Sequence, residues 1–167
     1  MPVLAESKKR QINPTPNAWD SLISSRSSLA RLYAFEPMKR IAMVKEGAPA
    51  ALVPFLADNM AITKERLYRI AGVARATLDR KIRADLRLSL DESERFIGIA
   101  LLIGQAAKIV KESGEPKNFD AGKWIAAWLD RPLGAIGGVR PETLMDTAEG
   151  RELVSDTLAR MQSGAYA

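Results

Sequence analysis

The sequence predicts an all-α protein. Glycine and proline turn signals divide its 167 residues into short segments whose apolar side chains recur at helical spacing. No segment shows the sustained alternation of apolar and polar residues that is typical of strands. Ser89 and Glu92 have the spacing of a capping box, which marks the start of a helix. Together these three observations favour helices throughout the chain.

Residues 1–48 are predicted to form a basic tail followed by short helices. Residues 8–10 read Lys-Lys-Arg within a polar stretch, and a solvated tail is the state expected of them. Apolar residues recur at helical spacing over 19–33. A further helical segment over 38–45 stops before Gly47.

Residues 49–114 are predicted to form the second unit. Its first helix is expected to begin with Pro49, a residue suited to the first turn of a helix, and to run to residue 59. Thr63 is expected to cap the next helix and Gly72 to supply the turn that follows it. Another helix is expected from about Arg75.

The last helix of this unit is predicted to run from the capping box to about residue 112. Its nearly apolar stretch, 96–107, has twelve residues, fewer than the roughly 20 that cross a bilayer. We therefore expect neighbouring helices to cover it. The amino terminus also lacks the continuous apolar stretch of a secretory signal, so the protein is expected in the cytoplasm and not in a membrane.

Residues 115–167 are predicted to form a third unit, because Gly114 and Pro116 interrupt the helical pattern. A short helix is expected over 123–129, and Thr147 is expected to cap a last helix. The glycines at 134, 137 and 138 lack the Lys-Ser/Thr ending of a phosphate-binding loop. They are interpreted as turn residues.

The composition argues against catalysis. The chain has no cysteine and no histidine, which removes thiol nucleophiles, imidazole bases and the commonest metal ligands. Asp91, Glu92 and Glu94 form the densest acidic group and are interpreted as residues of a first helical turn. A helical enzyme that uses carboxylates is the alternative. We predict no catalytic residue, no metal and no cofactor.

Basic residues are concentrated in one window, residues 64–87. The window holds eight basic and three acidic side chains, a net charge of +5, which equals the net charge of the whole chain. It also has the layout of a helix-turn-helix, with Gly72 between a helix that carries Leu67 and a helix that carries Leu78. A cationic helix pair of this kind predicts DNA binding. A solvated surface helix is the alternative.

The outer face of the second helix provides the candidate DNA contacts. Arginine can hydrogen-bond guanine edges in the major groove, and threonine can contact a thymine methyl group or a phosphate. Two features depart from the usual motif: Tyr68 stands where a small residue is common, and the last core position falls one residue late, at Ile82. The predicted DNA-binding residues are Arg75, Thr77, Arg80, Lys81 and Arg83.

Trp124 and Trp128 are four residues apart and are expected on one helix face. Large rings usually fill the core of a small domain, and this is the interpretation of Trp128. Trp124 is either a second core residue or an anchor in a protein interface.

A spaced string of residues at the carboxy-terminal end resembles a known family. The string consists of Trp128-Leu129, Leu133-Gly134, Gly137-Gly138, Arg140-Pro141, Leu144-Met145-Asp146-Thr147, Gly150, Arg160 and Gly164-Ala165-Tyr166-Ala167. It is similar to the toxin-binding domain of Xre/MbcA/ParS antitoxins, and residues 49–114 are similar to that family's Xre-like helix-turn-helix domain.

The resemblance implies an antitoxin that inhibits a RES- or ParT-type toxin, an NAD-consuming enzyme similar to ADP-ribosyltransferases, and that represses its own operon. Helix-turn-helix recognition of a palindromic operator implies a homodimer. A stand-alone helix-turn-helix regulator with a dimerising or ligand-sensing carboxy-terminal domain is the alternative. The predicted toxin-binding residues are Trp124, Arg160, Met161, Gly164, Tyr166 and Ala167.

Overall fold

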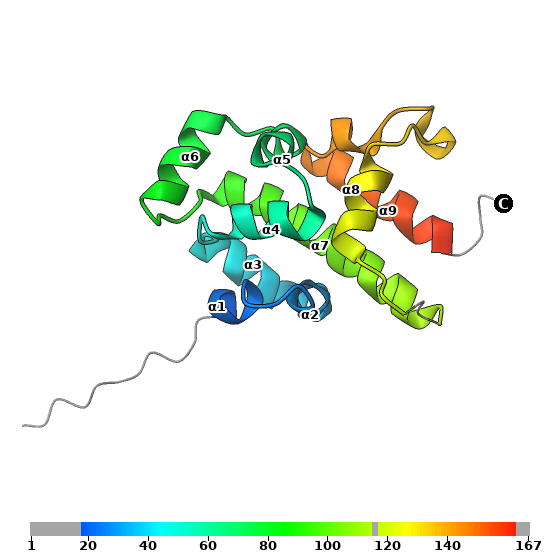
Figure 1. Ribbon diagram of the computed structural model, residues 1–167, viewed down its shortest axis with the longest axis horizontal. Coiled ribbons are helices and arrows are strands. Elements are labelled where there is room, and N and C mark those ends of the chain that lie inside the picture. Colours follow the sequence, from blue (N-terminus) through cyan, green and yellow to red (C-terminus); the bar gives the residue numbers. More distant parts are fainter. Residues whose placement is uncertain (1–17, 115–116, 163–167) are drawn as a thin grey trace, which may run out of the picture.

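The fold is all-α, as the sequence predicts. The computed structural model describes residues 18–114 and 117–162, and within these ranges every regular element is a helix (Figure 1). The α-helices are α1 (Ala18–Leu22), α2 (Ser28–Ala34), α3 (Pro37–Glu46), α4 (Leu52–Met60), α5 (Lys64–Ala71), α6 (Arg75–Arg83), α7 (Leu90–Glu112), α8 (Ala121–Leu129) and α9 (Ala148–Gln162). Two short 3-10 helices are η1 (Gly134–Ile136) and η2 (Pro141–Leu144).

Helix α7 is the central element, and it runs diagonally through the molecule (Figure 1). The predicted capping box begins it: the Ser89 hydroxyl accepts a hydrogen bond from the Glu92 amide at 3.2 Å, and the Glu92 carboxylate accepts one from the Ser89 amide at 2.7 Å. Most of its residues from Phe96 to Ala106 are buried, because α2, α3, α8 and α9 all pack against it. The prediction of a covered helix is confirmed. No helix in the described ranges has both the length and the apolarity needed to cross a bilayer.

The helices before residue 49 are part of the core. Trp19, Leu29 and Leu32 are almost completely buried, and α2 packs along α7. The two helices approach closely at Gly104, where an added Cβ would lie 2.8 Å from the Cβ of Tyr33. Residues 8–10 lie outside the described residues.

The start of α4 differs from the prediction. The helix begins at Leu52, whereas Pro49 forms an isolated bridge with Arg87. The amide of Leu88 donates to the Ala48 carbonyl at 2.8 Å, and the amide of Ala50 donates to the Leu86 carbonyl at 2.9 Å. Proline has no amide to donate, so it suits this extended segment as well as it suits a first helical turn. The bridge ties the chain before α4 to the chain after α6.

One hydrophobic core spans the described residues, from Trp19 in α1 to Leu158 in α9. The predicted boundary near residue 114 coincides with the turn after α7, where Gly114 has a φ of 85°. Helices on the two sides of this turn nevertheless pack together, with α8 against both α4 and α7. Residues on either side of the predicted boundary therefore share the same core.

Candidate functional site

Helices α5 and α6 form the helix-turn-helix that the sequence predicts. The Thr63 side chain caps α5 by accepting a hydrogen bond from the Arg66 amide at 3.2 Å. Gly72 ends the helix in the left-handed conformation, with a φ of 66°, which costs little without a side chain. Leu67 on α5 and Leu78 on α6 are fully buried and pack the pair onto the rest of the core.

Tyr68 has a structural role that explains its departure from the usual motif. Its side chain is buried, and its hydroxyl donates a hydrogen bond to Asp79 Oδ1 at 2.8 Å. Burial and this hydrogen bond raise the pKa of Tyr68. Hydrogen bonds from Tyr68 and Arg75 lower the pKa of Asp79, so the carboxylate stays charged. Tyr68 thus joins the two helices through a polar contact where other motifs use close packing.

Lys81 lies away from the outer surface of α6. Its Nζ is 2.5 Å from Glu92 Oε2, and its side chain is only 15% exposed. The prediction that Lys81 contacts DNA does not fit this position, because the side chain already neutralises a carboxylate beneath the helix. The late core position at Ile82, which is partly buried, turns Lys81 toward the first turn of α7. Glu92 therefore anchors α6 and caps α7 with one carboxylate.

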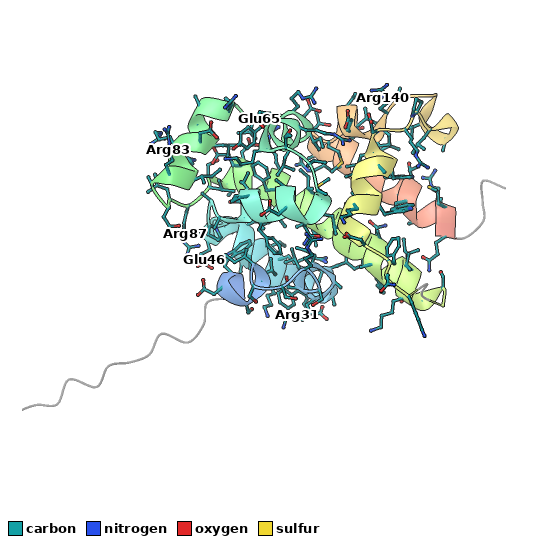
Figure 2. The ribbon with its side chains drawn as sticks, viewed as in Figure 1. Arg31, Glu46, Glu65, Arg83, Arg87 and Arg140 are labelled. Atoms are coloured by element: carbon teal, nitrogen blue, oxygen red, sulfur yellow. The ribbon has the colours of Figure 1, made fainter. Side chains whose placement is uncertain are left out.

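The other predicted DNA-binding residues lie on or near the outer surface. Arg80 and Arg83 are exposed, and Thr77 is partly exposed. Arg75 is also exposed and forms ion pairs with Glu65 at 3.5 Å and with Asp79 at 3.2 Å. Arg83 lies at the outer edge of α6 (Figure 2), where its Nε donates to the Asp79 carbonyl at 3.2 Å.

Only part of the basic charge in residues 64–87 is available to a partner. Arg66 pairs with Glu142, Lys81 with Glu92, and Arg87 with Glu46, which lies beside it in Figure 2. Together with Arg75, these account for half of the eight basic residues. The basic residues of the window that form no ion pair among the described residues are Lys64, Arg69, Arg80 and Arg83. All four are exposed, so the cationic surface is narrower than the sequence count indicates.

The two tryptophans of α8 have different environments. Trp128 is 3% exposed and belongs to the core, as predicted. Trp124 is 37% exposed, and its ring stacks on that of Trp128 with centroids 6.0 Å apart and an interplanar angle of 12°. The centroid of the Phe119 ring lies 6.2 Å from that of Trp124, at an interplanar angle of 53°. Trp124 therefore presents a partly exposed aromatic ring that packs against two aromatic neighbours.

Of the other predicted toxin-binding residues, Arg160 and Met161 lie in the last turn of α9 and are exposed. Gly164, Tyr166 and Ala167 lie outside the described residues. Trp124 lies on α8 and not on α9. Helix α8 packs on α4 and α7, whereas α9 packs on α7 and η2. Gly137 and Gly138 have positive φ in a turn closed by a bridge between Leu133 and Val139, which agrees with their interpretation as turn residues.

Two arginines connect the helix-turn-helix to the carboxy-terminal segment, and the sequence did not predict this role. Arg66 on α5 donates to the Ala126 carbonyl of α8 at 2.9 Å and pairs with Glu142 of η2 at 3.0 Å. Arg95 on α7 donates to the carbonyls of Ala71 and Asp146, at 3.0 and 2.6 Å. In the sequence, Arg66 counts only as one more charge of the basic window, because its acceptors are far along the chain.

Two family models match the chain. The antitoxin Xre-like helix-turn-helix domain matches residues 39–100, and the antitoxin Xre/MbcA/ParS C-terminal toxin-binding domain matches residues 119–164. A protein of a Sphingobium species, named Prs ADP-ribosylating antitoxin, is 39% identical over 136 residues, which cover 81% of this chain and 86% of that protein. The chain belongs to the Xre/MbcA/ParS antitoxin family.

This antitoxin is also similar to two proteins named antitoxin Xre. The one from Photorhabdus laumondii is 27% identical over 164 residues and 98% of each chain. The one from Yersinia enterocolitica is 27% identical over 105 residues, which cover 63% of this chain and 66% of that protein. The first family model begins at residue 39 in α3, ahead of the predicted start at 49. The chain is thus an antitoxin with an Xre-like helix-turn-helix domain and a C-terminal toxin-binding domain.

Proposed function

We propose that this antitoxin binds and inhibits an NAD-consuming toxin of the RES or ParT type in the cytoplasm and represses its own operon as a homodimer. The observation that carries the choice of toxin is the similarity to the Sphingobium protein, whose name refers to ADP-ribosylation. ADP-ribose transfer uses NAD as its donor. The antitoxin itself performs no catalysis in this proposal, and it needs no cofactor.

The carboxy-terminal segment supplies the toxin contacts in this proposal. Trp124 is an exposed aromatic ring fixed by stacking, which is the kind of anchor that contributes most to protein interfaces. Met161 adds an exposed apolar side chain in the last turn of α9, and Arg160 adds a charge beside it. A rigid ring loses little conformational freedom on binding, so its apolar surface contributes nearly all of its burial energy.

The test of toxin identity is co-expression with the adjacent open reading frame. We expect the neighbour alone to deplete cellular NAD and stop growth, and we expect co-expression to restore both and to yield a complex on purification. An antitoxin that purifies alone beside a harmless neighbour would support the stand-alone regulator instead. If the neighbour is toxic but leaves the NAD pool unchanged, the protein is still an antitoxin, but its toxin is not of the RES or ParT type.

Residues 164–167 are proposed to obstruct the toxin's active-site cleft, as the family resemblance implies. Tyr166 offers a flat aromatic ring that could fill part of such a cleft. Deleting residues 164–167 should restore NAD consumption in the complex while the two proteins still purify together. A complex that stays fully inactive after this deletion would show that the tail is not needed for inhibition.

The DNA-binding surface is proposed to be the outer face of α6, with Arg80 and Arg83 as its main contacts. Both side chains are exposed and form no ion pair with a described residue. Arg75 and Thr77 lie on the same short helix, and the exposed Lys64 and Arg69 on α5 can contact phosphates. Because Lys81 pairs with Glu92, it is not included in this surface.

The double variant Arg80→Ala/Arg83→Ala should weaken operator binding by roughly 10- to 100-fold and reduce its salt dependence, because arginine contacts release counterions. Toxin neutralisation should be unchanged. The matched control is Lys108→Ala/Lys111→Ala, which removes two positive charges near the carboxy-terminal end of α7. Equal binding by the two double variants would mean that net charge, and not the face of α6, determines DNA affinity.

A further inference from the structure

An apolar groove of about 440 Å³ lies where α3, α7 and the start of α9 meet. Ile97 of α7 is buried in it, whereas Ile41 and Leu90 line it and are 44% and 55% exposed. Met38, one helical turn before Ile41, is 74% exposed. Three large apolar side chains thus meet solvent on one surface, which is typical of a site where another protein binds.

The lining of the groove carries an excess of positive charge. Arg40 and Lys45 of α3 and Arg151 of α9 line it together with one acid, Glu94 of α7. Three basic side chains and one acidic side chain leave a net charge of +2. Glu94 attracts Arg151 and offsets part of its charge. None of the three basic side chains forms an ion pair with a residue in the described ranges.

Arg151 is positioned by main-chain and packing contacts and not by an ion pair. Its Nη1 donates to the Met145 carbonyl at 3.1 Å. Its side chain crosses α7 at Gly98, where an added Cβ would lie 2.7 Å from Arg151 Cδ. Burial and the charge of Arg95 lower the pKa of Arg151, despite the attraction of Glu94 and of two aspartates. The guanidinium therefore has a fixed position and too little negative charge around it.

Arg40 has a similar environment and lies beside Arg151. Both side chains line the groove and also a smaller hollow of about 270 Å³ between α2, α7 and α9. Glu152 lines only the smaller hollow, so the positive excess belongs to the groove. Nη1 of Arg40 donates to the Tyr33 carbonyl at 2.8 Å. A guanidinium has several N–H donors, and the described residues accept from only one in each of these two side chains. The remaining donors can bind carboxylates.

We propose that this groove binds an acidic, amphipathic segment of the toxin. The inference rests on the proposed function, because the toxin is the protein partner assigned there. Apolar side chains of the segment cover Met38, Ile41 and Leu90. Its carboxylates pair with Arg40 and Lys45 at the edge of the groove.

The position and the charge of the groove favour the toxin over a second copy of this chain. Ala148 and Arg151 line the groove and lie within residues 119–164, which match the toxin-binding domain. Helix α9 has 15 residues and is about 20 Å long. A partner of ordinary interface size that contacts Arg160 and Met161 at the end of α9 therefore also reaches the groove. A two-fold pairing of grooves would instead bring the same cations face to face.

Charge reversal at two exposed positions tests the inference, with the toxin affinity of the full chain measured by calorimetric titration. Lys45→Glu should weaken toxin binding on the order of 5-fold, because it places a carboxylate beside the acidic segment. Glu94→Lys should strengthen binding by a similar factor, because it removes the acid of the groove. The matched control is Lys111→Glu, at an exposed lysine of α7 outside the groove, and it should leave the affinity unchanged. Two groove variants that shift the affinity in the same direction, or not at all, would overturn the inference.

The apolar contact is tested by Ile41→Asp, which should weaken toxin binding by at least about 10-fold. The control is Leu86→Asp, at a 41% exposed apolar residue between α6 and α7 that does not line the groove. Urea unfolding shows whether each variant keeps its fold, and the two charge reversals decide the matter if Ile41→Asp does not. If Ile41→Asp lowers the oligomeric mass of the free antitoxin and leaves toxin affinity unchanged, a second copy covers the groove and the inference is wrong.

The unmodified antitoxin separates failure of this inference from failure of the proposed function. If the adjacent gene product neither depletes NAD nor binds the unmodified chain, the proposed function is wrong and this inference fails with it. If that protein binds the unmodified chain and every groove variant equally, other surfaces hold the toxin and only this inference is overturned.

Discussion

Arg66 and Glu142 are 76 residues apart in the sequence, yet Nη2 of Arg66 lies 3.0 Å from Oε2 of Glu142. Each side chain is less than a quarter exposed, and the same Nη2 donates to the Ala126 carbonyl at 2.9 Å. One guanidinium therefore holds α5 of the helix-turn-helix against α8 and η2 of the toxin-binding segment. The helix-turn-helix and the toxin-binding segment are thus in direct contact.

Replacing Arg66 should destabilise the whole chain. Arg66→Ala leaves the Glu142 carboxylate and the Ala126 carbonyl without this donor, so we expect the free energy of unfolding to fall by about 1–3 kcal/mol. Urea unfolding measures this change, and a single transition is expected because the described helices share one core. Arg75→Ala, which breaks exposed ion pairs, is the control and should change stability little. Equal losses in the two variants would contradict the structural role of Arg66.

Gly72 should be intolerant of a side chain for two reasons. Its φ is 66°, and an added Cβ would lie 2.6 Å from the Cβ of Asp146. Gly72→Ala should therefore cost more than about 2 kcal/mol, the sum of a left-handed backbone penalty and overpacking. The control is Gly114→Ala, which has a φ of 85° but no atom within 4 Å of its added Cβ. Thermal or urea unfolding of both variants separates the two costs, and similar losses would mean that the contact with Asp146 is unimportant.

The Lys81–Glu92 ion pair should make stability depend on pH in the acid range. Burial opposes ionisation of Glu92, but hydrogen bonds from Lys81 and the Ser89 amide outweigh it and hold the pKa of the carboxyl below its ordinary value of 4.5. Because the folded pKa is lower than the unfolded one, this stabilisation is present above pH 4.5 and is lost as the pH falls through the folded value.

Glu92→Gln tests this dependence because it removes the charge and keeps the shape. The variant should be about 1–2 kcal/mol less stable than the unmodified chain at neutral pH. The difference should shrink as the pH falls below 4.5. Glu152→Gln on the exposed face of α9 is the control and should show no such convergence. A stability difference that is constant with pH would exclude the ion pair as its source.

Alanine variants of Trp124 and Trp128 should differ, with one affecting mainly toxin binding and the other mainly the stability of the fold. Trp128→Ala removes a buried ring and should cost about 3–5 kcal/mol in unfolding free energy. Trp124→Ala should cost much less stability and should weaken toxin binding by at least about 10-fold if the ring is an interface anchor. Urea unfolding and calorimetric titration of the toxin measure the two effects. If the toxin affinity is unchanged in Trp124→Ala, Trp124 is a residue at the edge of the core and not an interface anchor.

Local chemistry explains which features could be predicted from the sequence. The cap at Thr63, the left-handed turn at Gly72 and the capping box at Ser89 depend on residues at most four positions apart, and all three are confirmed. The burial of Trp128 followed from the usual use of large rings. The family resemblance, which rests on spaced residues after Trp128, led to the correct family and the correct pair of domains.

Features that depend on distant partners could be found only in the folded chain. In the sequence, Lys81 and Arg66 are two of the eight charges of the basic window, and Lys81 is a predicted DNA contact. In the structure each of them pairs with a carboxylate on another element. Pro49 is predicted to begin a helix, but in the structure it forms a bridge with Arg87, which is distant in the sequence. Capping and turn chemistry act over one helical turn and can be read from neighbouring residues. Ion pairs and packing join residues that only the fold brings together, so the tertiary structure decides which charges remain free for a partner.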